Sequence, residues 1–217
     1  MKKQLFILTV ALLPLFSKAQ STVDNFQLGF TTSPNIAWFS VDDNRNGVSN
    51  DGVRTGFSYG VLADLGFARN YYFSTGFTLT SVNGKTSRTE GGNTYYSDVY
   101  KIRYIDVPLT LKLKSNPNQM GRFYGQFGLG MGVKTSAKGT SSSKLLGETP
   151  VETDNARIDD VNTFRLSLVA GAGAEWAVKD NLSILTGLTY NNGFTKVVSG
   201  NPGMKNSYLA LTLGVFF

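Results

Sequence analysis

The residue types that most often carry chemistry in enzymes are largely missing from this chain. Among its 217 residues there is no histidine and no cysteine, so the commonest general acid–base, the thiol nucleophile and the usual zinc ligands are absent. A serine–lysine pair or carboxylates alone would remain available for hydrolysis, but no spacing in the sequence indicates such a site. We therefore expect no catalytic residue, no metal site and no cofactor.

Three acidic and three basic residues fall in segments that otherwise alternate between apolar and small or polar residues. They are Asp64, Asp106, Lys112, Lys134, Arg165 and Glu175. All six share the polar face of their segments, and charges that leave water need partners. We expect them to pair with one another in a filled, water-poor polar interior. The alternative is that they line an ion or proton path, or supply carboxylates for hydrolysis.

Alternating glycines raise the possibility of a nucleotide site, which their spacing does not support. Gly128, Gly130 and Gly132 alternate with apolar residues, as do Gly171 and Gly173. A dinucleotide fingerprint needs the spacing G-x-G-x-x-G at a strand-to-helix turn. Alternate glycines instead suit the inside of a narrow barrel, where larger side chains would overfill the space.

The net charge gives no sign of a nucleic-acid partner. The chain carries 21 lysines and arginines against 15 acidic residues, a formal charge of +6. Three of the lysines, Lys2, Lys3 and Lys18, precede residue 20, and without them the balance is 18 against 15, or +3. No cluster of basic residues interleaved with aromatics appears either.

Eight segments with period-two alternation would have to position these residues, and no sustained helical stripe appears. In one of them Phe127, Leu129 and Met131 share a face opposite Gly128 and Gly130. About ten residues at ~3.3 Å each, tilted by about 40°, cover the ~25 Å apolar band of an outer membrane. The segments are residues 26–39, with an irregularity expected at Ser33-Pro34, 54–67, 71–82, 104–113, 123–133, 164–178, 182–190 and 208–217.

The connections between these segments alternate in length. The long polar ones are 40–53, 83–98, 135–160 and 191–206, and the short ones are 68–70, 115–121 and 179–181. This pattern predicts an all-β fold, an eight-stranded antiparallel up-and-down transmembrane β-barrel with long outer loops and short periplasmic turns. The alternation alone does not show whether the apolar or the polar face of the strands is inside the barrel. A soluble barrel with an apolar interior is the alternative. The glycines of the polar face favour the transmembrane arrangement, with the polar face inside and the apolar face against lipid.

The first 19 residues have the layout of a secretory signal. Met1-Lys2-Lys3 is a positive start, an apolar run follows, and cleavage is expected between Ala19 and Gln20. The run from Leu5 to Phe16 is 12 residues long, shorter than the roughly 20 that a membrane-spanning helix needs. We expect export through the Sec pathway and a single outer-membrane barrel domain over residues 20–217.

The closing segment alternates and ends on an aromatic residue. Tyr208, Leu213, Val215 and Phe217 resemble the signal by which the barrel-assembly machinery recognises outer-membrane barrels. This machinery and the outer-membrane lipids are therefore the expected partners. Aromatics near strand ends are expected to form the girdles at the two membrane interfaces: Trp38, Phe39, Tyr71, Tyr72, Tyr100, Trp176 and Tyr190.

A family resemblance lies in three short runs. Tyr104–Lys112 (YIDVPLTLK), Phe123–Gly130 (FYGQFGLG) and Ala170–Trp176 (AGAGAEW), with the closing strand, resemble the PorT-like outer-membrane β-barrel proteins. The resemblance extends over essentially all of residues 20–217. It implies a small barrel in the envelope of a Gram-negative bacterium, in a family named after a member linked to type IX protein secretion.

The function expected from these observations is non-enzymatic. We expect an integral outer-membrane barrel that acts structurally, or through its long outer loops as an interaction protein. One alternative is an accessory component of a type IX-like secretion system, with other envelope or secretion proteins as partners. The second alternative is a lipid-modifying barrel enzyme that works without histidine. A channel is not expected, because eight strands leave too little room.

Overall fold

Every described element of the chain is a β-strand. The computed structural model describes residues 26–41, 47–91, 94–145, 149–158, 160–179, 182–198 and 203–217. The expected signal segment, with Ala19 and Gln20, lies outside them. Within the described residues, no helix is long and apolar enough to span a membrane.

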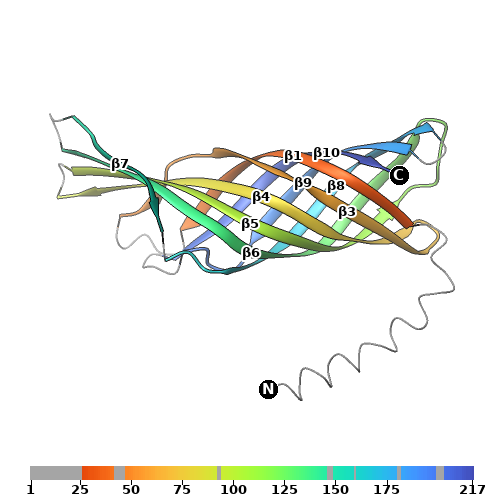
Figure 1. Ribbon diagram of the computed structural model, residues 1–217, viewed down its shortest axis with the longest axis horizontal. Helices are drawn as coiled ribbons and strands as arrows, with labels where there is room; N and C mark the ends of the chain where they lie inside the picture. The colour runs from red at the N-terminus through yellow and green to blue at the C-terminus, as the bar shows by residue number, and fades with distance from the viewer. Residues whose placement is uncertain are drawn as a thin grey trace, which may run out of the picture.

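Eight long antiparallel strands form a closed barrel (Figure 1). Each strand pairs with the next in sequence, and the last pairs with the first, so the ring has no open edge. The predicted eight-stranded up-and-down barrel is therefore confirmed. Its strands are β1 (Phe26–Val41), β3 (Arg54–Ala68), β4 (Tyr71–Glu90), β5 (Thr94–Lys114), β6 (Gly121–Leu145), β8 (Phe164–Lys179), β9 (Leu182–Gly193) and β10 (Met204–Phe216).

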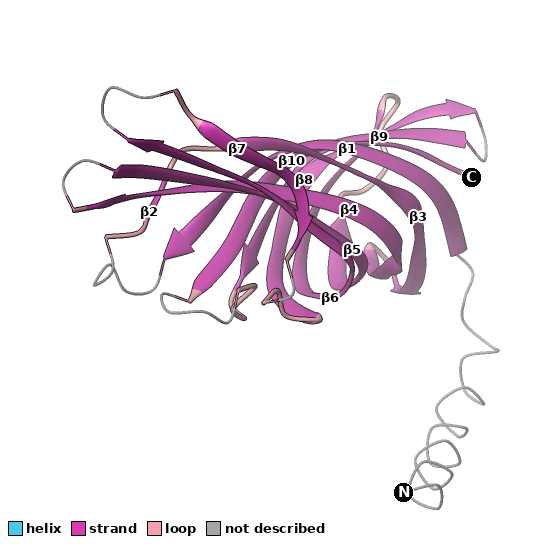
Figure 2. Cartoon of the chain, turned by 60° about the vertical axis from the view of Figure 1, so that its left-hand side comes forward, coloured by secondary structure: helices cyan, strands magenta, loops and turns pink. Residues whose placement is uncertain are grey.

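Three of these strands continue far beyond the ring at one end, where they form a projecting sheet (Figures 1 and 2). β6 has 25 residues, whereas β9 has 12. Two short strands complete this outer sheet: β2 (Ser49–Asn50) pairs with β4, and β7 (Val151–Arg157) pairs with β6. We use "outer sheet" for β2, β7 and three strand segments that project beyond the ring. These segments are residues 85–90 of β4, 94–99 of β5 and 139–145 of β6.

The prediction of loops over residues 83–98 and 135–160 was wrong. Lys85 to Glu90 pair with Thr94 to Val99, and Ser136 to Leu145 pair with the same strand from its other side. These segments are rich in threonine, which favours strands, and the first of them also contains Tyr95 and Tyr96. They are polar on both faces, so the alternation that identifies a half-buried strand is absent from their sequence.

The irregularity expected at Ser33-Pro34 is a gap in the pairing with β10 and not a bulge. β1 keeps an unbroken register with β3, where Pro34 lies opposite Phe57. On the β10 side the ladder passes over Ser33 and Pro34 without a shift, so the missing proline N–H interrupts the pairing locally. A bulge lies instead in β6, where Arg103 pairs with Ser136 but Tyr104 pairs with Lys134.

The apolar face of the strands points outward. Phe77 is 69% exposed and Phe127 is 58% exposed, whereas Asp64 and Ser167 on the opposite parity are 0% exposed. A water-soluble barrel would have the reverse arrangement. A continuous apolar wall of this kind is the surface that lipid tails cover in an outer-membrane barrel.

Glycines on the inner face make room for aromatic rings. A Cβ on Gly29 would lie 2.6 Å from the ring of Phe216, and one on Gly84 would lie 2.1 Å from the ring of Phe39. Both rings are therefore inside the barrel, and Phe39 is 2% exposed. At these two positions the absence of a side chain on glycine gives an aromatic ring its place in the lumen.

The aromatic girdle prediction was wrong for three residues. Tyr72 is 3% exposed, and Tyr100 packs edge-on against the buried ring of Phe39, with 5.4 Å between centroids. All three residues occupy positions whose side chains point into the barrel. The prediction used only their position near a strand end, which does not show whether a side chain points inward or outward. Trp38 and Tyr190 stack on the outer face at 6.2 Å, and the remaining exposed members are Tyr71 and Trp176.

Replacing Leu129 with Arg tests which surface faces lipid. Leu129 is 47% exposed and lies midway along the apolar part of β6. A charge there should lower the free energy of unfolding by about 2–4 kcal/mol, because arginine is poorly solvated at the bilayer midplane. The measurement is urea unfolding in lipid vesicles, followed by tryptophan fluorescence.

The matched control is Leu145→Arg in the same strand. Leu145 is 44% exposed but lies in the outer sheet, so its replacement should change the unfolding free energy by less than about 0.5 kcal/mol. Equal effects at the two positions would contradict the assignment of β6 to a membrane-spanning part and an outer part.

Candidate functional site

Four charged side chains meet in the lumen near the short-turn end of the barrel. Lys112 Nζ lies 2.8 Å from Asp64 Oδ2 and 3.0 Å from Glu175 Oε1, and Lys114 Nζ lies 2.9 Å from each of the same two oxygens. Charges of opposite sign therefore alternate around a square. We call Asp64, Lys112, Lys114 and Glu175 the charge square.

The charge square is almost fully withdrawn from solvent. The four residues are between 0% and 4% exposed. Two cations and two anions balance to zero net charge, and each group touches two partners of opposite sign. A buried ionic group is tolerated only with such compensation, because desolvation of a lone charge costs several kcal/mol.

Aromatic side chains surround the two lysines. Lys112 Nζ lies 4.5 Å from the ring centroid of Tyr124 and 4.9 Å from that of Phe216, and Lys114 Nζ lies 4.2 Å from the ring centroid of Tyr72. Ring faces attract cations, and the attraction is larger where water is excluded. Gln27 Oε1 also accepts a hydrogen bond from Lys114 at 2.6 Å.

Strands from the whole ring contribute to this closure. The square itself comes from β3, β5 and β8, and Gln27, Tyr72, Tyr124 and Phe216 come from β1, β4, β6 and β10. Leu185 of β9 packs against Tyr124 and Phe216. All eight strands therefore meet at one level of the lumen, which side chains fill at this end.

Sequence reasoning missed Lys114. The residue shares the inward parity of Lys112 on β5, and this signal was available. It stands at the end of the strand, where we expected a turn to begin. Its inclusion gives the square two lysines for two carboxylates, whereas Lys112 alone would leave a net negative charge.

A second charged group lies nearer the outer end. Arg165 Nη1 is 4.0 Å from Asp106 Oδ1, and Arg165 Nη2 donates hydrogen bonds to Asn191 Oδ1 and to the carbonyl oxygen of Asn206. The arginine is 1% exposed. The structure thus divides five of the six predicted charges between two separate groups.

Lys134 belongs to neither group. It is half-buried, and its Nζ donates a hydrogen bond to the carbonyl oxygen of Val161. Among the described residues no carboxylate lies within ion-pair distance of it. The predicted pairing therefore does not extend to this lysine, because an inward-folded segment supplies a backbone acceptor that strand parity does not anticipate.

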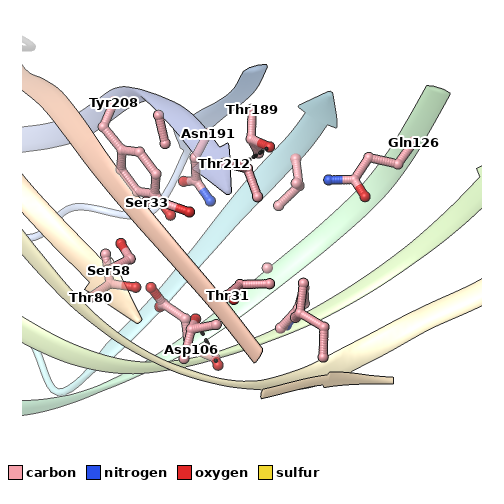
Figure 3. A pocket seen from close by; sticks show the side chains of 16 residues that line it. Thr31, Ser33, Ser58, Thr80, Asp106, Gln126, Thr189, Asn191, Tyr208 and Thr212 are labelled. Atoms are coloured by element: carbon pink, nitrogen blue, oxygen red, sulfur yellow. Dashed lines mark hydrogen bonds between the residues drawn. The ribbon is translucent and has the colours of Figure 1, made fainter. Parts of the chain in front are cut away.

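A small cavity lies in the lumen beside Asp106 (Figure 3). Its volume is about 90 Å³, room for roughly three waters at ~30 Å³ each. Neither carboxylate oxygen of Asp106 has a hydrogen-bond partner among the described residues, so water is the natural partner. The lining is mostly hydroxyl and amide groups, among them Thr31, Ser33, Ser58, Thr80, Gln126, Thr189, Asn191 and Thr212.

An apolar cluster occupies the outer end of the lumen. Val161, Val197 and Val198 come from segments between strands and pack against the inward residues Phe39 and Ile102. The three valines are 1% to 7% exposed. Connecting segments thus turn into the barrel mouth and fill it, and we call this apolar group the outer plug.

Local side-chain contacts order the outer sheet. Lys85 Nζ lies 2.5 Å from Asp51 Oδ2, and Tyr95 donates a hydrogen bond to the same oxygen at 3.2 Å. The hydrogen bond from Lys85 holds the pKa of the Asp51 carboxyl below its ordinary value. Arg88 lies over the ring of Tyr96, 4.6 Å from its centroid, so side chains on both faces are ordered by local contacts.

The seam between β1 and β10 contains the residues expected to form an assembly signal. Phe217 donates its N–H to the carbonyl oxygen of Leu28 at 2.8 Å and accepts the N–H of Leu28 at 3.0 Å. Its ring lies 6.0 Å from that of Phe30. Leu213 and Val215 face outward beside it, whereas Tyr208 is 8% exposed and belongs to the outer plug.

The described residues contain no group of three or more histidine, cysteine, aspartate or glutamate side chains placed to hold a metal ion. The square has its charges mutually paired. The cavity that Asp106 lines has a volume of about 90 Å³, too small for a lipid or a peptide.

A model of one protein family matches most of the chain. Its description is outer membrane protein beta-barrel domain, and the match covers residues 18–199. No curated protein matches the chain.

Several solved structures are similar to the chain. Neisserial surface protein A has 15% identity and a TM-score of 0.45, over 88% of this chain and 95% of that one. OprG of Pseudomonas aeruginosa has 9% identity and a TM-score of 0.40, over 88% and 95%. Ail, the attachment invasion locus protein of Yersinia pestis, has 13% identity and a TM-score of 0.35, over 89% and 99%.

Replacing Glu175 with Gln tests the charge square. The change leaves two buried lysines with one carboxylate, Asp64, and should lower the free energy of unfolding by about 3–5 kcal/mol. The measurement is denaturant unfolding of the refolded barrel in detergent or lipid. Glu152→Gln is the matched control, because Glu152 is an exposed residue of the outer sheet, and should leave the midpoint unchanged. An unchanged midpoint for Glu175→Gln would indicate a hydrated lumen.

Proposed function

The chain belongs to the outer membrane protein beta-barrel domain family, and from this premise we propose that it is a non-enzymatic integral barrel of the Gram-negative outer membrane. In this proposal the lumen is structural, and the protein works through its outer sheet as an interaction protein. The observation that carries the proposal is the contrast between a lumen filled at both ends and strands that continue well beyond the ring.

The filled lumen argues against transport as the main task. At one end the charge square and its rings draw on all eight strands, and at the other the outer plug occupies the mouth. Between them lies a cavity of about 90 Å³. An eight-stranded barrel has space for side chains but not for an aqueous pore as well.

The length of the outer strands supports a role in binding. A strand of 25 residues is about 80 Å long at ~3.3 Å per residue, more than twice what the membrane requires. Tyr95 is 41% exposed and Val151 is 68% exposed on a sheet otherwise rich in serine and threonine. Exposed tyrosine among small polar residues is typical of surfaces that recognise proteins.

A narrower proposal rests on the motifs of Tyr104–Lys112 and Ala170–Trp176, which support membership of the PorT-like proteins. The partner of the outer sheet would then be a component of a type IX-like secretion system, and this chain an accessory subunit. The lipid-modifying alternative has less support, because the charged groups described above face the lumen while the outward face is apolar.

Photo-crosslinking in intact cells tests the role of the outer sheet. A photoreactive residue at Tyr95 should form adducts with a discrete envelope protein, whereas one at Leu188, which is 55% exposed on the apolar wall, should form none with that protein. Adducts are detected by mass spectrometry after gel separation. Identical adducts at both positions would contradict the proposal, as would steady conductance steps of porin size from the purified barrel in planar bilayers.

We further propose that the closing strand, with Leu213, Val215 and Phe217, is read by the barrel-assembly machinery. Its pairing with β1 joins the two edges of the ring. Until those edges pair, their backbone groups are unsatisfied, which a bilayer does not tolerate. A machine that inserts barrels must therefore act on this strand before the seam closes.

Replacing Phe217 with Asp should block insertion while leaving export intact. A charge near the interface costs the folded barrel only about 0–1 kcal/mol, so a large loss of inserted protein would exceed what stability explains. Membrane fractions are compared by heat-modifiable gel mobility, with Phe217→Tyr as the control that keeps an aromatic ring. Normal amounts of inserted Asp variant would contradict recognition of this residue.

A further inference from the structure

Three basic side chains gather on the outward face of β5 and β6, just beyond the apolar wall. Lys101, Arg103 and Lys138 are all exposed. Lys101 and Lys138 lie directly opposite one another in the ladder, and Arg103 is two residues from Lys101 on the same face. None of the three forms an ion pair with a described residue.

The bulge in β6 creates this arrangement. Without it, Lys138 would share the parity of Lys134 and Gly132, which face the lumen. The extra residue, Thr135, reverses the parity, so that Ala137 turns inward against Ile102 and Lys138 turns outward. Thr135 donates its hydroxyl proton to the carbonyl oxygen of Arg103 at 3.2 Å, which ties the bulge to the basic strand.

Like charges directly opposite in a sheet repel each other and destabilise the pairing. The ladder between β5 and β6 could place small polar residues here, as it does at Ser97 and Ser142. An anion bound between Lys101 and Lys138 would remove the repulsion. The basic patch is thus arranged for a ligand with concentrated negative charge.

The height of the patch above the apolar wall indicates which kind of ligand it can meet. Ile105 and Val133 are the last outward residues of the apolar wall on the two strands, at 39% and 44% exposure, and Arg103 and Lys138 follow them toward the outer sheet. Two further residues along a tilted strand rise about 5 Å, which places Arg103 in the headgroup layer, about 5–8 Å thick on each side. Lys101, another ~5 Å higher, lies at the outer edge of that layer. A phosphate bound there can carry acyl chains that lie against the apolar wall below.

We propose that Lys101, Arg103 and Lys138 bind the phosphate group of a phosphorylated glycolipid in the outer leaflet. The lipid, rather than a soluble phosphate, is the occupant because the patch is continuous with the lipid-covered wall. The site rests on the proposed function, since it requires an inserted barrel with its outer sheet away from the periplasm. It would anchor the barrel at a fixed depth and hold a lipid against β5 and β6.

Native mass spectrometry of barrels in nanodiscs tests the site. The nanodiscs contain lipid A with its phosphates, or the same lipid A after enzymatic dephosphorylation. The wild-type barrel should retain the phosphorylated form preferentially. Because each cation near a charged membrane surface contributes roughly a fivefold effect, the variant Lys101→Gln/Arg103→Gln/Lys138→Gln should lose that preference by a factor on the order of 100.

The matched control removes the same charge elsewhere. All three control residues are exposed and lie away from the patch: Arg69 is in a short turn, Lys179 is the last residue of β8, and Lys144 is at the tip of the outer sheet. Their triple replacement by Gln should change retention by less than about twofold. Equal retention of both lipids by the wild type, or equal behaviour of the two triple variants, would overturn the site.

Two further readouts separate the possible failures. Inorganic phosphate at millimolar concentration should not displace the lipid, and displacement would overturn the lipid as occupant. A wild-type chain without heat-modifiable mobility would overturn the proposed function together with the site. A barrel with heat-modifiable mobility that retains phosphorylated and dephosphorylated lipid A equally would overturn the site alone.

Discussion

Backbone pairing on both sides of every strand is the constraint from which the rest of this structure follows. In a bilayer there is no water to satisfy free N–H and C=O groups, so a sheet must close on itself. Here β10 pairs with β1 from Gly29–Phe216 to Val41–Met204. Closure of eight strands fixes a narrow lumen, and that lumen then determines which side chains the inward positions can hold.

The narrow lumen is filled in three layers of different character. The charge square lies at the short-turn end, a small polar-lined cavity lies in the middle, and the outer plug lies at the other end. Ionic groups are placed where rings and strands from the whole circumference enclose them, and Asp106 lies where water can reach it. Because each layer draws on most of the strands, the interior holds the ring together across its diameter as well as around its edge.

The sequence was sufficient for the ring and for much of the lumen, but not for the outer sheet. Alternation identified all eight strands because an apolar wall and a polar lumen differ at every residue, and inward parity placed Asp64, Lys112 and Glu175 correctly. Lys114 was missed because a strand end has no alternation beyond it. Lys138 could not be placed from alternation because one bulged residue reverses which side chains face inward. The partner of Lys134 could not be foreseen either, because it is a backbone carbonyl from a segment folded into the barrel mouth.

The outer sheet differs from an ordinary surface loop because its strands are the strands of the wall. Lys85, Tyr95 and Ser142 stand on backbone whose register is continuous with the membrane-spanning ladder, apart from the one bulge at Thr135. A binding surface on continuous strands loses less conformational entropy when it meets a partner than a flexible loop does. Its height above the bilayer is also set by the apolar wall below. Since closure leaves no room for a site inside the ring, extension of the same strands is the way in which this fold presents ordered side chains to the outside.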